Sequence, residues 1–129
     1  MLYVTDTHPF LWHLSNDDRL SKKASEIFTK AELGEATIVV PTIVLAESFY
    51  IVKKQKVEIN FAEVIEKVEF ASNFTTFPLD LKVIKEIQKL DKLPELHDKI
   101  VVATAQILAA DLISKDDEIK KSGYVNVIW

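Results

Sequence analysis

Four acidic side chains stand where a carboxylate needs an explanation, beside predicted strands or in apolar stretches: Asp6, Glu47, Asp98 and Asp116. Glu47 is the only charged residue between Ala36 and Val52, where an unpaired carboxylate is costly to bury. Carboxylates that gather in one place repel one another unless a cation lies among them. Ligation by oxygen alone suits Mg²⁺ or Mn²⁺ rather than zinc, so the pattern predicts a site for a divalent cation.

Each acid also has an ordinary structural explanation, and these alternatives remain open at this point. Asp98 stands at the start of a predicted helix and is a good residue type for capping it. Glu47 could form a salt bridge with a nearby lysine, and Asp6 could be a turn residue after a strand. Asp116 is followed by Asp117, so either could cap the next helix or share one role in the site.

The elements that position these acids alternate along the chain. Strands are predicted by short apolar or β-branched runs, at 2–5, 37–40, 75–77 (weakly), 112–114 and 125–128. Helices are predicted at 8–14, from Ser21 to about 33 before Gly34, from Pro41 to about 54, from Asn60 to about 71, at 80–90, at 97–110 and at 117–121. In the helix over 80–90, Leu81, Ile84, Ile87 and Leu90 fall on one side.

Alternating strands and helices indicate a single α/β domain over residues 1–129. Its central sheet is expected to be short and mostly parallel, with helices on both faces. Ligands of such sheets gather beyond the carboxyl ends of the strands. Asp6 and Asp116 follow two of the strands, Glu47 lies in the second turn of one helix, and Asp98 lies in the first turn of another. All four acids are therefore expected at one edge of the sheet.

Composition limits the classes of function. The 129 residues include no cysteine, which rules out disulfides and thiolate zinc sites. A net charge of −4 argues against a protein that holds nucleic acid by phosphate contacts alone, but not against a metal-dependent enzyme. The N-terminus lacks the pattern of a signal peptide and no apolar run is long enough to span a membrane, so a cytoplasmic location is expected.

Four segments carry a family resemblance: VTDTH at 4–8, PTIVLAE at 41–47, LHDKIVVATA at 96–105 and LISKD at 112–116. Together, in this order and spacing, they resemble the four motifs of PIN domains. The resemblance covers the whole chain and is greatest to the VapC-type toxins of toxin–antitoxin pairs. It implies an endoribonuclease that uses Mg²⁺ or Mn²⁺, often forms a homodimer and is silenced by a cognate antitoxin.

The resemblance also implies roles for individual residues. Asp6, Glu47, Asp98 and Asp116 become the catalytic acids, with Asp6, Asp98 and Asp116 as metal ligands. Ser114 is expected to orient a neighbouring carboxylate, and Thr104 to pack inside its helix. Metal-assisted attack by water on RNA would leave a 5′-phosphate and a 3′-hydroxyl.

Two other functions are compatible with the same motifs, and several other residues have a possible role. The same fold could serve a housekeeping nuclease in RNA processing, or a degenerate PIN domain that only binds. The three histidines, His8, His13 and His97, are expected at the surface or in packing, with His97 closest to RNA. A basic group at 53–56 suits a helix C-terminus or phosphate contact. Apolar residues of the first two helices (Phe10, Trp12 and Phe28) are expected in the core or, for the homodimer, exposed at its interface.

Overall fold

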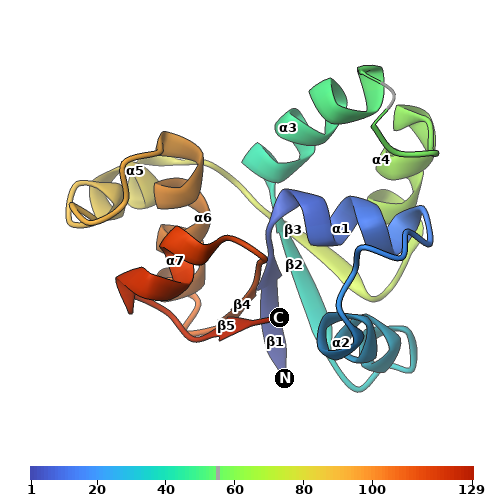
Figure 1. Cartoon of the computed structure of the whole chain (residues 1–129), viewed down its shortest axis with the longest axis horizontal. Coiled ribbons are helices and arrows are strands. Elements are labelled where there is room, and N and C mark those ends of the chain that lie inside the picture. The colour runs from blue at the N-terminus through green and yellow to red at the C-terminus, as the bar shows by residue number, and fades with distance from the viewer. Residues whose placement is uncertain (55) are drawn as a thin grey trace.

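The computed structural model describes residues 1–54 and 56–129, and a five-stranded parallel sheet lies at its centre (Figure 1). The strands are β1 (Leu2–Thr5), β2 (Thr37–Pro41), β3 (Phe74–Phe77), β4 (Asp111–Ile113) and β5 (Val127–Ile128). Their runs of Val, Ile and Thr suit strands covered on both faces, and the middle of β1 and β2 is buried. The α/β fold class predicted from the sequence is confirmed.

The order of the strands is β3-β2-β1-β4-β5, and it creates a special place beside β1. From β1 the chain adds β2 and β3 on one side, then returns to add β4 and β5 on the other. In parallel sheets, the point where the order reverses leaves a crevice at the carboxyl ends of the two strands. Here that crevice lies between β1 and β4, where Thr5 pairs with Ile113.

Seven helices within the described residues cover the sheet: α1 (Thr7–Leu14), α2 (Lys22–Glu32), α3 (Thr42–Lys53), α4 (Phe61–Phe70), α5 (Leu81–Ile87), α6 (Leu96–Ile107) and α7 (Asp117–Ser122). Figure 1 shows α1 to α4 on one side of the sheet and α5 to α7 on the other. Two predicted caps are confirmed: Ser21 accepts from the amide of Ala24, and Asn60 from that of Glu63. Pro41 ends β2 and caps α3, instead of lying in the first turn of that helix.

The buried side of α5 differs from the prediction. Leu81 and Ile84 are 66% and 44% exposed, whereas Val83 is fully buried. The helix ends at Ile87, so Leu90, which is 1% exposed, reaches the core from the turn that follows. The regular spacing continued past the real end of the helix, and it therefore predicted the wrong side.

The aromatic residues of the first two helices are buried. Phe10 and Phe28 are 0% exposed and Trp12 is 5% exposed, so the expectation that they form an exposed dimer interface is wrong. Phe10 meets Phe74 edge to face at 5.6 Å, and Phe28 stacks on His13 at 4.3 Å. These contacts fill the space between the helices and the sheet, which is the alternative role expected for them.

None of the described helices combines the length and the apolar character that crossing a membrane requires.

Two leucines that were expected on the same side of α5 provide a matched test of this packing. Leu90→Ala should lower the free energy of unfolding by about 2–5 kcal/mol, because it leaves a cavity in the core. Leu81→Ala should change it by less than about 0.5 kcal/mol, because its side chain is mostly in solvent. Urea unfolding measures both, and equal losses would contradict the observed packing.

Candidate active site

Asp6 stands at the crevice between β1 and β4. It directly follows β1 and caps α1, where its Oδ1 accepts a hydrogen bond from the amide of Thr7 at 2.8 Å. Its own amide donates to the carbonyl of Ile113 at 2.9 Å, which ties the residue to the end of β4. Asp6 therefore has the structural role of joining the strand to the helix, as its N-cap. Its carboxylate nevertheless lies at the reversal point of the sheet.

Ser114 joins Asp6 to the segment after β4. Its hydroxyl donates to Asp6 Oδ2 at 2.8 Å and accepts from the amide of Asp116 at 3.1 Å. Asp116 caps α7 by accepting from the amide of Ile119 at 3.1 Å. Asp117 lies in the first turn of α7 and is exposed, so the structure gives the capping contact to Asp116 and not to Asp117.

His97 links the acids of two further elements. Its Nε2 lies 3.1 Å from Asp6 Oδ1, and its Nδ1 lies 3.4 Å from Glu47 Oε2. Glu47 thus has a histidine as its partner, instead of the lysine considered from the sequence. This bridge was missed by sequence reasoning, which placed His97 near RNA but not among the acids. The available signal was its position directly before Asp98, in the first turn of α6.

Asp98 has the least favourable surroundings of the four acids. Its side chain is buried, at 8% exposed, and no side chain caps the start of α6, whose N-cap is Glu95. Burial, followed by the negative charges of Asp116 and Asp6, raises the pKa of Asp98 to about 6. The helix-capping explanation of Asp98 therefore has no contact to support it, while its proximity to two other acids is evident.

Two members of the cluster, Asp6 and His97, stabilise each other's charged forms. Burial opposes the ionisation of Asp6, but its hydrogen bond with His97, the charge of His97 and the donors Ser114 and Thr7 outweigh it and lower the pKa of Asp6. Burial likewise disfavours the charged form of His97, yet Asp6 and then Glu47 and Asp98 raise the pKa of His97. An imidazolium at this position offsets part of the negative charge of the acids.

The acids suit a divalent cation by chemistry, although they are not arranged around one. Asp6, Asp98 and Asp116 supply only oxygen atoms, and the raised pKa of Asp98 shows that His97 does not fully compensate the negative charge around it. Within residues 1–54 and 56–129, no group of three or more His, Cys, Asp or Glu side chains is placed to hold a metal ion. Both oxygens of Asp6 already accept hydrogen bonds.

Thr104 makes the contact of a packing residue. Its hydroxyl donates to the carbonyl of Ile100 at 2.8 Å within α6, and its side chain is 1% exposed. It does not contribute to the cluster of acids.

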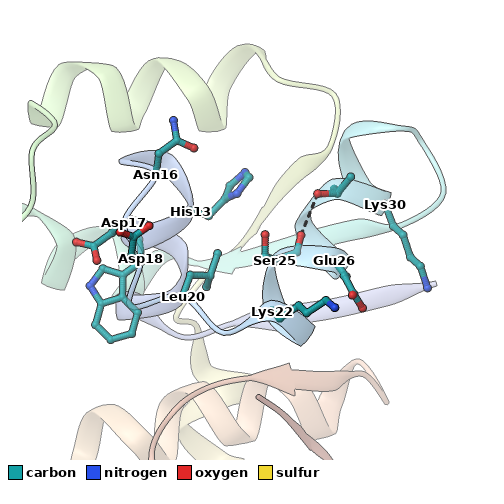
Figure 2. Close-up of a pocket in the computed structure, with 11 residues that line it drawn as sticks. His13, Asn16, Asp17, Asp18, Leu20, Lys22, Ser25, Glu26 and Lys30 are labelled. Atoms are coloured by element: carbon teal, nitrogen blue, oxygen red, sulfur yellow. Dashed lines mark hydrogen bonds between the residues drawn. The ribbon is translucent and has the colours of Figure 1, made fainter.

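A hollow of about 780 Å³ lies along α1 and α2 and is lined by none of the four acids. Figure 2 shows Asp17 and Asp18 at one end of it and Lys22, Glu26 and Lys30 toward the other. A smaller hollow, of about 470 Å³, is lined by Asp6 and Asp116 and is therefore the one that opens on the candidate site.

Comparison with known proteins agrees with this architecture. Among solved structures, VapC20 of Mycobacterium tuberculosis, described as a sarcin–ricin loop cleaving toxin, has a TM-score of 0.71 at 12% identity, with 100% of both chains covered. VapBC2 of Rickettsia felis, bound to a promoter DNA fragment, has 0.70 at 18% identity, covering 98% of this chain and 97% of that one. A toxin–antitoxin complex from Klebsiella pneumoniae has 0.68 at 17% identity, covering 95% and 94%.

These likenesses establish the fold, and no curated protein sequence matches the chain. The model of the PIN domain family matches residues 3–123, a span that contains Asp6, Glu47, Asp98 and Asp116. By that match, which takes in most of the sheet and every acid of the candidate site, the chain belongs to the PIN domain family.

Proposed function

We propose that this protein is a metal-dependent endoribonuclease and the toxin of a toxin–antitoxin pair. The observation that carries the proposal is the crowding of Asp6, Asp98 and Asp116 at the reversal point of the sheet, where the pKa of Asp98 is raised to about 6. Membership of the PIN domain family supports a hydrolase that acts on RNA. The toxin assignment is supported by solved neighbours that are themselves toxins or toxin–antitoxin complexes.

In this proposal Asp6, Asp98 and Asp116 hold Mg²⁺ or Mn²⁺, and Glu47 completes the catalytic acids. A bound ion would activate a water molecule and neutralise charge on the phosphate. Ser114 fixes the orientation of Asp6 through its hydrogen bond of 2.8 Å. His97 keeps Asp6 and Glu47 close to each other, and the side chain of Glu47 is 36% exposed to solvent.

One observation favours a different function, a PIN domain that binds without cleaving. His97 occupies both Asp6 and Glu47, and the described residues include no ready-made group of metal ligands. A housekeeping nuclease of RNA processing would share the site but have no antitoxin. Cleavage and partner binding therefore separate the three functions.

Cleavage of RNA by the purified protein should require Mg²⁺ or Mn²⁺ and leave 5′-phosphate and 3′-hydroxyl ends. Asp98→Asn should abolish it, because a ligand and its charge are lost, while Asp91→Asn, at an exposed turn, should leave it intact. When the metal is below saturation, activity should also fall below about pH 6, where a proton competes with the ion for Asp98. Gel analysis of a panel of RNAs, in metal and in chelator, measures these effects.

The neighbouring acids supply an internal control for this experiment. Asp116→Asn should remove activity and Asp117→Asn should keep it, because only Asp116 is bonded to Ser114 and lies near Asp98. Equal cleavage by the wild type and Asp98→Asn, with contaminating ribonuclease excluded, would overturn the assignment of the site.

Stability without metal should show the repulsion among the acids. The pKa of Asp98 is raised from 3.8 to about 6 by folding, so its contribution to stability is lost as the pH rises through this window. In chelator at pH 8, Asp98→Asn should therefore be at least as stable as the wild type. Near pH 3.5 the two should differ little. Thermal melting at both pH values measures the difference.

Added Mg²⁺ should make the wild type more stable than Asp98→Asn, the reverse of their order in chelator. Mg²⁺ at ten times its dissociation constant should stabilise the wild type by about 1.4 kcal/mol, which is roughly 3–5 °C for a domain of this size. Asp98→Asn should respond much less, because a ligand is gone. A helix-capping Asp98 gives the opposite pattern: its loss would cost about 1 kcal/mol and Mg²⁺ would change nothing.

The proposed partners are a cognate antitoxin and a second copy of the chain. Exposed apolar side chains near α5, Leu81 and Leu96, support a protein interface there, in place of the buried N-terminal aromatics. Co-expression with the product of a short adjacent reading frame should yield a complex without ribonuclease activity. Sedimentation at micromolar concentration should show a dimer of the free protein. Monomer alone, and no binding by any adjacent gene product, would contradict these two proposals.

A further inference from the structure

A group of basic side chains lies beside the acids, in the hollow of about 470 Å³ that Asp6 and Asp116 also line. Its basic members are Arg19, Lys56 and Lys115. They come from three separate segments: the connection from α1 to α2, the segment before α4 and the turn between β4 and α7. A hollow lined by both carboxylates and cations suits a phosphodiester chain that reaches a metal-bound phosphate.

Trp12 holds two of these cations in place. The guanidinium carbon of Arg19 lies 5.0 Å from the centre of the Trp12 ring, and Lys115 Nζ lies 5.6 Å from the centre of that ring. Two cations so close to one indole repel each other, and attraction to the face of the ring offsets this repulsion. The indole nitrogen is buried and has no hydrogen-bond partner among the described residues. Packing and the two cations, and not a hydrogen bond, therefore keep the ring where it is.

Trp12 itself is 5% exposed, so it cannot offer a free face for stacking a nucleotide base. The ring of Trp129 lies 5.9 Å away and that of His8 lies 5.4 Å away, which covers it further. The indole is a support for the cations, and the cations are the groups that face the hollow.

The cations differ in how fully they are neutralised. Arg19 forms a two-pronged ion pair with Asp17, through Nε at 2.9 Å and Nη2 at 2.6 Å, and also donates to the carbonyl of Lys56 at 3.2 Å. Lys115 and Lys56 form no salt bridge in the part of the chain that the structure describes. Arg19 is thus a fixed anchor, and the uncompensated positive charge of the hollow belongs to the two lysines.

Lys115 has the closest connection to the chemistry. It stands between Ser114 and Asp116, whose hydrogen bond of 3.1 Å fixes the turn. Its exposed side chain extends over Trp12 instead of pairing with an acid. We propose that Lys115, supported on Trp12 beside Arg19 and assisted by Lys56, binds an RNA phosphate next to the one that is cleaved. This inference rests on the proposed ribonuclease function and adds to it the place of the substrate strand.

The test measures binding separately from cleavage. Binding of a fluorescein-labelled single-stranded RNA is followed by anisotropy in the inactive Asp98→Asn background, over a range of salt concentrations. Lys115→Met should bind several-fold more weakly, and the slope of log K against log salt should become shallower by about 0.7, the value for one phosphate contact of a single strand. Lys115→Arg should restore both, because it returns a cation to the face of Trp12. Lys120→Met, the same loss of charge at an exposed position of α7, should resemble the parent.

Cleavage assays of the same lysine variants, with Asp98 intact, test the phosphate site at Lys115 separately from the ribonuclease function. Lys115→Met should raise KM for RNA far more than it lowers kcat. Cleavage by the wild type together with unchanged binding and slope in Lys115→Met would overturn the phosphate site and leave the ribonuclease standing. Binding that depends on Lys115 without any cleavage would keep the phosphate site and overturn the ribonuclease. A folded wild type that neither binds nor cleaves RNA would overturn both.

Discussion

Repulsion between carboxylates at the reversal point of the sheet is the constraint around which this protein is organised. β1 and β4 are neighbours in a parallel sheet, and the residues that follow them, Asp6 and Asp116, are therefore brought to one crevice. The first turn of α6 adds the buried side chain of Asp98 to the same place. No side chain of the described residues caps the start of this helix. Folding thus holds together groups that would separate if they were free, and burial together with the charges of Asp116 and Asp6 raises the pKa of Asp98.

The rest of the site can be understood as the response to that repulsion. Ser114 and the amide of Thr7 donate to Asp6, and His97 brings a titratable positive charge between Asp6 and Glu47. These contacts lower the pKa of Asp6. They leave the Asp98 side chain without a hydrogen bond or salt bridge to any of the described residues. In the proposed function, this remaining imbalance would make a divalent cation a fitting ligand, and the bound ion would allow a chain with a net charge of −4 to act on RNA.

Much of this arrangement could be predicted from the sequence because it depends on local features. A β-branched run followed by an acid, or a helix start after Ser21 or Asn60, is determined by neighbouring residues, and the strand ends that carry Asp6 and Asp116 were predicted for that reason. The pairing of β1 with β4, the contact of His97 with Asp6 and the approach of Lys115 to Trp12 join residues about 90 to 110 positions apart. No local pattern encodes such contacts. The error in α5 shows another limit of local patterns, since a regular spacing of apolar residues cannot show where a helix stops.

The most direct measurement is the titration of Asp98, followed by the NMR signal of its labelled carboxyl carbon with and without Mg²⁺. In the metal-free protein the carboxyl should titrate with a pKa near 6, and in Asp116→Asn with a lower one, since one of the charges that raise it is removed. Saturating Mg²⁺ should lower the pKa of Asp98 in the wild type, because a ligand of the ion must give up its proton. A pKa near 3.8 that neither Mg²⁺ nor the loss of Asp116 alters would contradict this account.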